Sequence, residues 1–193
     1  MSPRAGLDTH TLVIAAADIA DEQGIEAVTL AALAAKLGVR SPSLYNHING
    51  LQGLRTLLAI YGLEQLYTRM SAAVEGVSGD IAIHAMSQAY VDFARSRPGL
   101  YETTLRAAEL ENVPLELAGN HILSLMIHVL KAYDLGEEGE LHAIRGLRSI
   151  LHGFTSLEHK GGFGMPLDAN ISLSRLISTF IAGIGNMKAV GKG

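Results

Sequence analysis

The sequence predicts an all-α fold, and three observations support that prediction. Apolar residues recur with the period of a helix along nearly the whole chain. Alternating runs of Val, Ile and Thr joined by tight turns do not occur, and a single Asn49-Gly50 pair is the nearest hairpin signal. Glycine and proline interrupt the periodic segments where helices would end. We expect about nine helices, with three short ones in residues 1–50 and longer, more apolar ones in residues 51–193.

The composition indicates a globular chain in a reducing compartment. The 193 residues are 48% hydrophobic and 18% charged, so a sizeable core can be buried. There is no cysteine, which excludes disulfides and thiolate metal sites. The first eight residues lack the pattern of a signal peptide, and no uninterrupted apolar run approaches the length of a membrane-spanning helix, about 18 residues. We therefore expect a cytoplasmic protein without a membrane segment.

Two short helices with clear end signals open the chain. The first is predicted from Thr9 to Gln23, where Gly24 supplies the C-terminal cap. Thr29 is a favourable N-cap for the second, which is predicted from Leu30 to Leu37 and ended by Gly38. Both helices carry an apolar stripe that needs a partner, so we expect them to pack together.

A third, very short helix is expected directly after the second. Ser41 would cap it, and Pro42 would occupy its first position, where a missing N–H costs nothing. Leu44 and Ile48 would point inward, and Gly50 would close the element. We therefore expect the segment from Ser41 to Ile48 to be a rigid helix with one buried side and one exposed side.

Six longer helices are expected after the third one. Pro98 ends one of them, because the residue before a proline resists the helical region, and Pro114 opens another. A glycine-rich loop, 160–167, separates the last two. The predicted ranges are 51–77, 80–97, 99–109, 114–133, 137–158 and 168–187.

The turn Gly38-Val39-Arg40 joins its two short helices as a helix-turn-helix does. In that motif the second helix is held so that its outer side enters the major groove of DNA, which is about 12 Å wide. Hydroxyl, amide and imidazole groups suit base edges, whereas flanking cations and helix caps suit phosphates. By this reasoning the candidate DNA-binding residues are Thr29, Lys36, Arg40, Ser41, Ser43, Tyr45, Asn46 and His47.

The charge balance limits how such a surface would hold DNA. The formal net charge is −4, and acidic residues slightly outnumber basic ones even in the first 60 positions. Any DNA contact must therefore come from a local patch. The same balance counts against an architectural DNA protein that acts without a ligand, because such a protein needs a basic surface.

Two stretches of sequence resemble a known family. The run TLAALAAKLGVRSPSLYNHI, from Thr29 to Ile48, resembles the DNA-binding signature of TetR-type regulators, and AAADIADEQG before it resembles their first helix. His152-Gly153-Phe154 with the later GGFGMP is similar to a C-terminal domain of the Trp-His-Gly type in that family. Leu151 stands where the signature Trp would be.

The resemblance implies an N-terminal helix-turn-helix domain, residues 1–50, and a C-terminal helical bundle, residues 51–193, that binds a ligand and dimerises. It also implies a repressor released by a small ligand. Tyr45 and His47 would lie against phosphates, and Thr29 would be a phosphate-contacting cap. Many members carry a Lys just after the reading helix, and this chain does not. The positions that match the reading helix are Ser41, Pro42, Ser43, Tyr45, Asn46 and His47.

Candidate effector and dimer residues come from the later helices. Polar and aromatic residues within apolar faces are individually typical of a core, but as a group they mark the place for a ligand between helices. The effector candidates are Tyr90, Phe93, Tyr101, His121, Leu125 and His128, with Met126 beside them. Small and apolar residues on the last two helices suit a four-helix interface between two copies. The interface candidates are Gly146, Ile150, Gly153, Leu173, Ile177, Phe180, Ile181 and Ile184.

These patterns predict a DNA-binding transcriptional regulator, acting as a homodimer on operator DNA and released by an unknown small-molecule effector. No cofactor is expected, and His121 and His128, seven residues apart, are read as ordinary helix residues rather than metal ligands. A small all-helical enzyme is the first alternative, but the chain has no nucleophile elbow, phosphate loop or His-Glu-x-x-His motif. A DNA-binding protein without a ligand is the second alternative.

Overall fold

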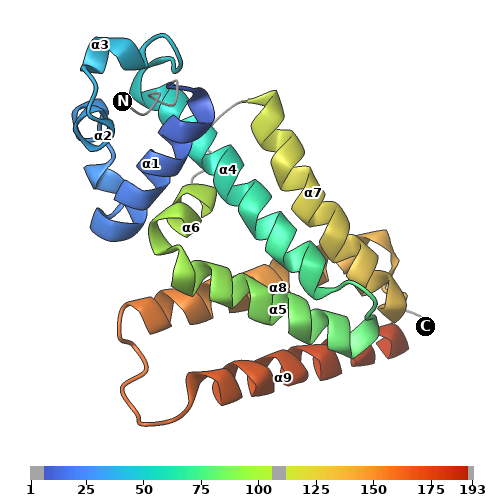
Figure 1. Ribbon diagram of the computed structural model, residues 1–193. Helices are drawn as coiled ribbons and strands as arrows, with labels where there is room; N and C mark the ends of the chain where they lie inside the picture. Colours follow the sequence, from blue (N-terminus) through green and yellow to red (C-terminus); the bar gives the residue numbers. More distant parts are fainter. Residues whose placement is uncertain (1–6, 106–111, 191–193) are drawn as a thin grey trace. The chain divides into compact units, whose positions relative to one another are not determined.

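The computed structural model describes residues 7–105 and 112–190, with side chains as far as Asn186. These residues form nine α-helices and no strand, with two short 3-10 turns (Figure 1). The prediction of an all-α chain of about nine helices is thereby confirmed. Part of the helix predicted at 99–109 lies outside the described residues.

The chain divides into two compact units. Unit 1 contains residues 1–65 and 96–118, and unit 2 contains residues 66–95 and 119–193. Helices α4, Gly50–Ala73, and α7, Val113–Leu130, run through both units. Unit 1 therefore holds the first three helices together with α6, which comes much later in the chain.

Helix α1, Thr9–Gln23, begins and ends where the local signals predict. The Asp8 carboxylate caps it by accepting a hydrogen bond from the Thr11 amide at 2.7 Å. This hydrogen bond favours the charged carboxylate and so lowers the pKa of Asp8. At the other end, the Gly24 amide donates to a carbonyl of the last turn and closes the helix.

Helix α2, Leu30–Leu37, also has the predicted ends. The Thr29 hydroxyl accepts a hydrogen bond from the Ala32 amide at 3.1 Å, which satisfies one of the unpaired donors of the first turn. Gly38 follows with a φ of 67°, a left-handed conformation that glycine adopts without strain. Local chemistry thus determines the helix that supports the turn.

Helix α3 is shorter than predicted, and a different residue caps it. It spans only Ser41–Leu44, and Arg40 is the N-cap, extended and without a side-chain hydrogen bond. Pro42 is therefore the second helical residue rather than the first. After Leu44 the chain forms a turn instead of continuing to Ile48, because the amides of residues 47 and 48 both donate to the Leu44 carbonyl. The predicted helix from Ser41 to Ile48 is wrong in its second half.

Helix α6, Pro98–Leu105, lies against the end of α1 within unit 1 (Figure 1). A Cβ atom on Gly99 would lie 2.0 Å from the carbonyl oxygen of Ala20, so only glycine fits at this contact. The Asp21 carboxylate accepts a hydrogen bond from the Leu100 amide at 2.9 Å and a second one from Nε of Arg97. A carboxylate of α1 thus caps the first turn of α6.

Unit 2 contains α5, Gly79–Ser96, α8, Gly136–His159, and α9, Ala169–Val190, with the later parts of α4 and α7. These ends differ by a few residues from the predicted ones, and the region predicted to end α7 at Tyr133 is a separate 3-10 turn. The core is apolar. Its fully buried members include Met70, Ile83, Met86, Phe93 and Leu130.

Arg95, near the end of α5, ties α8 to α9. Its Nε and Nη2 donate to the Glu158 carboxylate at 2.8 and 2.7 Å, and its Nη1 donates to the side-chain oxygen of Asn170 at 2.8 Å. The hydrogen bonds to Glu158 favour the charged guanidinium and raise the pKa of Arg95. The loop between α8 and α9 is therefore fastened at both ends.

Helix α7 bears on the expectation that no segment crosses a membrane, which stays a prediction. An 18-residue window within Val113–Tyr133 has a mean hydropathy of 1.3, so this stretch is long and apolar enough to cross a membrane. The prediction considered only uninterrupted apolar runs, and residues such as His121 and Ser124 interrupt this one. Length and composition alone are weak evidence, because the core helix of a soluble protein passes the same test.

Candidate nucleic-acid interface

The reading segment, residues 40–47, is anchored along one side. Leu44 is 0% exposed and Ile48 is 5% exposed, as their spacing predicts. Leu33 of α2 and Val28 are equally buried. The Thr9 hydroxyl also donates to the carbonyl of residue 47 at 3.4 Å, which ties the end of the segment to the start of α1. The segment is short, but its inner side belongs to the core of unit 1.

The other side of the reading segment is open. Tyr45 is 61% exposed, so its phenol hydroxyl is available to a phosphate or a base. The remaining polar groups can hydrogen bond to bases or phosphates. Arg40, Pro42 and Asn46 are exposed, whereas Ser41, Ser43 and His47 are half-buried.

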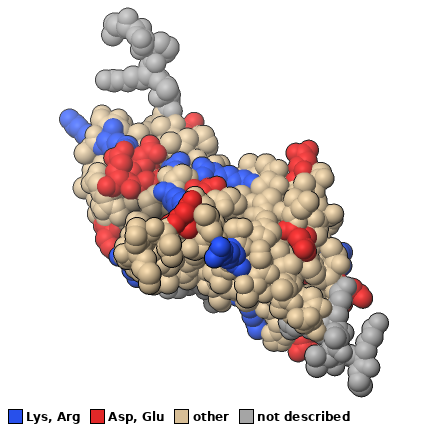
Figure 2. Space-filling model, turned by 90° about the horizontal axis from the view of Figure 1, so that it is seen from below, with Lys and Arg blue, Asp and Glu red and all other residues tan. Residues whose placement is uncertain are grey.

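Few cations surround the reading segment. Nζ of Lys36 lies 3.5 Å from a Glu22 carboxylate oxygen, and Nη2 of Arg55 lies 4.0 Å from a Glu26 carboxylate oxygen. Arg40 forms no such ion pair within the described ranges. On the face of the molecule that Figure 2 shows, which is not that of the reading segment, Lys and Arg side chains are interspersed with Asp and Glu between large uncharged areas. The local positive charge near the segment is small.

Thr29 lies at the N-terminus of α2, where backbone amides are available to a phosphate. Its hydroxyl already accepts a hydrogen bond from the Ala32 amide. A hydroxyl can still donate while it accepts, so the cap and a phosphate contact are compatible.

Three residues that hold the motif in place were not predicted. Arg97 pairs with Asp21 across 76 positions of sequence, and its Nη2 lies 3.5 Å from an Asp18 carboxylate oxygen. Gly99 makes the close contact between α6 and α1. No local pattern marks such residues, because their partners are distant in the chain. The Pro98-Gly99 pair at the start of α6 was the one local feature of the sequence that marked this contact.

The six predicted effector residues are divided between the two units. Tyr101 belongs to unit 1, whereas the other five belong to unit 2. Within unit 2, Tyr90 and Phe93 are buried on α5. The guanidinium carbon of Arg69 lies 5.1 Å from the centre of the Phe93 ring, within the range of a cation–π contact. Of the five effector candidates in unit 2, these two are the ones whose side chains are buried.

The α7 members of the set are less enclosed. Leu125 is half-buried, and His121 and His128 are exposed. The ring of His121 lies against that of Tyr67, with 5.5 Å between the ring centres. The two histidines therefore lie at the surface of the described unit rather than in its core.

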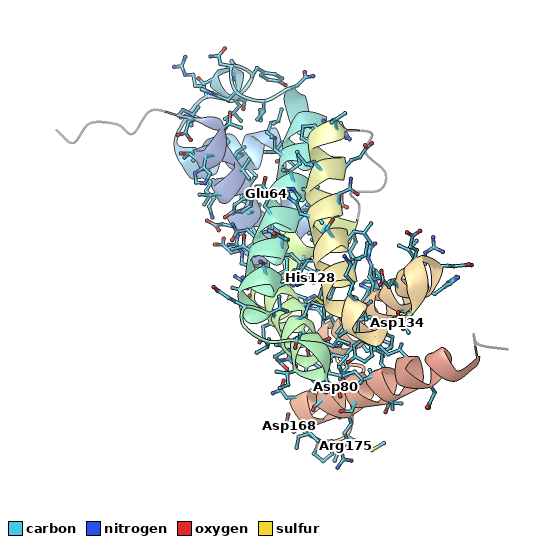
Figure 3. The ribbon with its side chains drawn as sticks, turned by 90° about the vertical axis from the view of Figure 1, so that its right-hand side faces the viewer. Glu64, Asp80, His128, Asp134, Asp168 and Arg175 are labelled. Atoms are coloured by element: carbon cyan, nitrogen blue, oxygen red, sulfur yellow. The ribbon has the colours of Figure 1, made fainter. Side chains whose placement is uncertain are left out.

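The interior of unit 2 holds no buried charged side chain within its described residues. Its buried polar residues are Ser87 and Thr155. The Thr155 hydroxyl donates to the Leu151 carbonyl at 3.0 Å, whereas the Ser87 hydroxyl has no hydrogen-bond partner. The ionisable residues of unit 2 that Figure 3 labels are all exposed, namely Asp80, His128, Asp134, Asp168 and Arg175.

The predicted dimer residues on α9 mostly lie in the core of a single chain. Leu173, Ile177, Ile181 and Ile184 are each at most 9% exposed. Side chains that are already buried in one chain have little surface left to bury against another. The apolar spacing therefore marks a face of α9 whose side chains are buried in a single chain, and the assignment of these four residues to an interface stays a prediction.

The predicted dimer residues on α8 are half-buried, as is Phe180 of α9. A Cβ atom on Gly146 would lie 3.5 Å from Phe180, so these two residues meet within one chain. Other apolar residues of α8, α9 and their loop are exposed instead. We call this group the outer apolar surface, and its members are Leu157, Phe163, Met165, Leu167, Ile171 and Leu176.

Comparison with known families assigns both parts of the chain. Residues 12–48 match the family described as bacterial regulatory proteins, tetR family, and residues 83–180 match the tetracyclin repressor-like C-terminal domain. The YobS protein of Bacillus subtilis (strain 168), described as an uncharacterized HTH-type transcriptional regulator, is 45% identical over 185 residues. The match covers 95% of this chain and 96% of YobS.

Solved structures share the fold. A Rhodococcus sp. RHA1 protein of unknown function has a TM-score of 0.82 at 20% identity, over 95% of this chain and 98% of its own. A TetR variant from Acinetobacter baumannii AYE, in complex with minocycline, has a TM-score of 0.71 at 20% identity, over 94% and 98%. The family matches indicate a DNA-binding regulator rather than an enzyme, as predicted. The chain belongs to the TetR family of bacterial transcriptional regulators.

Proposed function

We propose that this regulator is a repressor that holds its operator as a homodimer and releases it when a small molecule binds. In this proposal residues 1–50 form the DNA-binding domain, and residues 51–193 bind the effector and dimerise. The observation that carries the proposal is the reading segment, whose inner residues Leu44 and Ile48 are buried while Tyr45 is 61% exposed. An exposed tyrosine at the end of a clamped short helix suits a contact with the DNA backbone beside the groove.

The proposed contacts with DNA divide into two kinds. Groups on the reading segment approach base edges, and groups beside it approach phosphates. A dimer would present two reading segments about 34 Å apart, one turn of DNA. The complete proposed set is Thr29, Lys36, Arg40, Ser41, Pro42, Ser43, Tyr45, Asn46 and His47.

The proposed effector is a small, predominantly apolar molecule without a positive charge. Tyr90 and Phe93 are buried in unit 2, and no carboxylate is buried with them in its described part, whereas the half-buried guanidinium of Arg69 lies 5.1 Å from the Phe93 ring centre. Burying an unpaired charge would cost several kcal/mol, so such an interior discriminates against a cationic ligand. Binding would release DNA only if the effector prefers the conformation that fits the operator poorly.

The proposed dimer uses the outer apolar surface rather than the buried face of α9. Met165 is 75% exposed and Leu167 is 73% exposed, and such a group of large apolar side chains is rarely left in water. Ile150 and Gly153, which are half-buried on α8, would extend the contact. We also place the protein in the cytoplasm and outside the membrane, consistent with a chain that has no cysteine.

A gel-shift experiment with the upstream region of the protein's own gene tests the proposal at about 50 mM salt, where phosphate contacts are strong. We expect retardation by the full chain and a loss of at least about tenfold in affinity for Tyr45→Ala, the effect of roughly one good contact. Val77→Ala, at an exposed position of unit 2, is the matched control. Absence of retardation by the unaltered chain would overturn the proposal.

Light scattering tests the dimer separately. Met165→Glu places a charge in the outer apolar surface, and we expect it to shift the chain from dimer to monomer. Gln52→Glu, at an exposed position of unit 1, adds the same charge elsewhere and should leave the dimer intact. A Met165→Glu protein that remains dimeric would place the interface on another surface.

A further inference from the structure

Arg40 is the cation that the structure leaves uncommitted beside the reading segment. Lys36 lies within ion-pair distance of Glu22, and Arg55 lies within ion-pair distance of Glu26. Arg40 is exposed and has no carboxylate within such a distance in the described part of the chain. Its guanidinium is therefore available to a partner without the loss of an existing ion pair.

The position of Arg40 also distinguishes it from the other cations. It is the N-cap of α3, with an extended backbone at φ −85° and ψ 141°. In helix-turn-helix proteins the first residues of the reading helix contact the base edges. Because α3 has only four residues, Ser41–Leu44, its first turn is the whole of the helix that can enter the groove. Arg40 is the residue immediately before this turn.

The chemistry of the neighbouring side chains leaves the G·C base pair without a specific reader. An amide such as that of Asn46 pairs best with adenine, and hydroxyls such as those of Ser41 and Ser43 discriminate weakly between bases. A guanidinium presents two parallel N–H donors that match O6 and N7 of guanine, which is the commonest specific contact in the major groove. Among the residues of the reading segment, only Arg40 has this donor pair.

We infer that Arg40 reads a guanine in each half of the operator and is the main determinant of sequence specificity. The inference rests on the proposed function, operator binding by a dimer. It differs from the sequence-based expectation, in which Arg40 contacts a phosphate and therefore contributes affinity without base preference. The two roles predict different behaviour for an alanine at this position. Loss of a phosphate contact weakens binding to every sequence about equally, whereas loss of a base contact removes the guanine preference.

Selection from a random duplex library by the full-length dimer tests the inference. We expect the unaltered chain to enrich a two-fold symmetric site with a guanine at one position in each half. Changing that guanine to adenine should weaken binding by about 10- to 100-fold per half-site, the range for one two-pronged base contact. For Arg40→Ala the same change should cost less than about threefold.

Two further variants separate base reading from charge. Arg40→Lys should keep most of its affinity for random DNA and the salt dependence of that affinity. Its guanine preference should be weakened but not abolished, because an ammonium can still donate to O6 and N7 but lacks the rigid planar fork. Lys36→Ala removes one positive charge from the same surface, so it should weaken binding to every sequence while the guanine preference remains. Far-UV circular dichroism confirms that each variant is folded.

These experiments distinguish failure of the Arg40 inference from failure of the proposed operator binding. Retention of the full guanine preference by Arg40→Ala, or an enriched site without guanine, overturns the inference and leaves operator binding in place. Failure of the unaltered chain to enrich any sequence, or to retard any duplex, overturns the proposed function as well.

Discussion

Replacing Gly99 by alanine is the most direct test of how α6 is held against α1. The new Cβ atom would lie 2.0 Å from the carbonyl oxygen of Ala20 and 2.1 Å from its carbonyl carbon. Ordinary contact begins at 3.4 Å, so the two backbones must separate by about 1.4 Å, the difference of those two distances. Both contacting atoms belong to the backbone of a helix, so no side chain can rotate to relieve the overlap.

Such a displacement also breaks contacts beside the glycine. The Leu100 amide donates to the Asp21 carboxylate at 2.9 Å, and a hydrogen bond to a charged group contributes about 1.5–3 kcal/mol. Overpacking itself costs about 1–3 kcal/mol. We therefore expect Gly99→Ala to lower the free energy of unfolding by about 3 kcal/mol or more, which corresponds to a fall in Tm of about 6–12 °C for a chain of this size.

Thermal unfolding followed by circular dichroism at a fixed protein concentration measures this change. Gly119→Ala is the matched control, because a Cβ atom there meets nothing within 4 Å and the residue lies inside α7. Alanine is the better helix former by about 1 kcal/mol, so the control should be as stable as the unaltered chain or more so. A Tm for Gly99→Ala within about 1 °C of the unaltered chain would refute the close contact.

Three further predictions concern the caps of α1 and α2 and the hydrogen bonds that Arg95 of α5 makes to Glu158 and Asn170. Asp8→Asn keeps a side chain that can cap α1 but removes the titratable carboxyl group. Because the pKa of Asp8 is lowered in the folded chain, the charged carboxylate stabilises the fold at neutral pH, and this stabilisation is lost as the pH falls through the folded pKa. The Tm of the unaltered protein should therefore fall more between pH 7 and pH 3 than the Tm of the variant does. Thr29→Ala removes the α2 cap and should cost about 1 kcal/mol in urea unfolding, whereas Thr29→Ser should restore it. Arg95→Ala leaves the Glu158 carboxylate without its donor and should cost about 1–3 kcal/mol in the same assay, while Arg175→Ala, at an exposed position of α9, should change little.

Helices with strong local signals were predictable from the sequence. α1 and α2 begin at side chains that accept hydrogen bonds from their first turns, and Gly24 and Gly38 end them with positive φ angles. These interactions involve residues within a few positions of each other, so they can be predicted from the sequence alone. The helix-turn-helix and the family resemblance followed from the same local pattern.

Short and irregular segments were less predictable. Tyr45, Asn46 and His47 after Leu44 are weak helix formers, and they form a turn that leads to Ile48, which is buried in unit 1. Packing of one apolar side chain can outweigh helix propensity, which is worth less than about 1 kcal/mol per residue. The sequence therefore indicated which side chains face inward, but not how far the helix extends.

The sequence by itself determined the all-α class, the ends of the first two helices and the group of residues that can face DNA, because these depend on periodicity and on neighbours in the chain. Only the tertiary structure decided that α6 belongs with the first three helices, that Asp21 holds Arg97 across 76 positions, and that Leu173 and Ile177 lie inside one chain. Spacing shows that a helix has an apolar face, but what covers that face depends on which distant segments come together. Long-range contacts of this kind leave no local trace, since each partner alone is an ordinary helical residue.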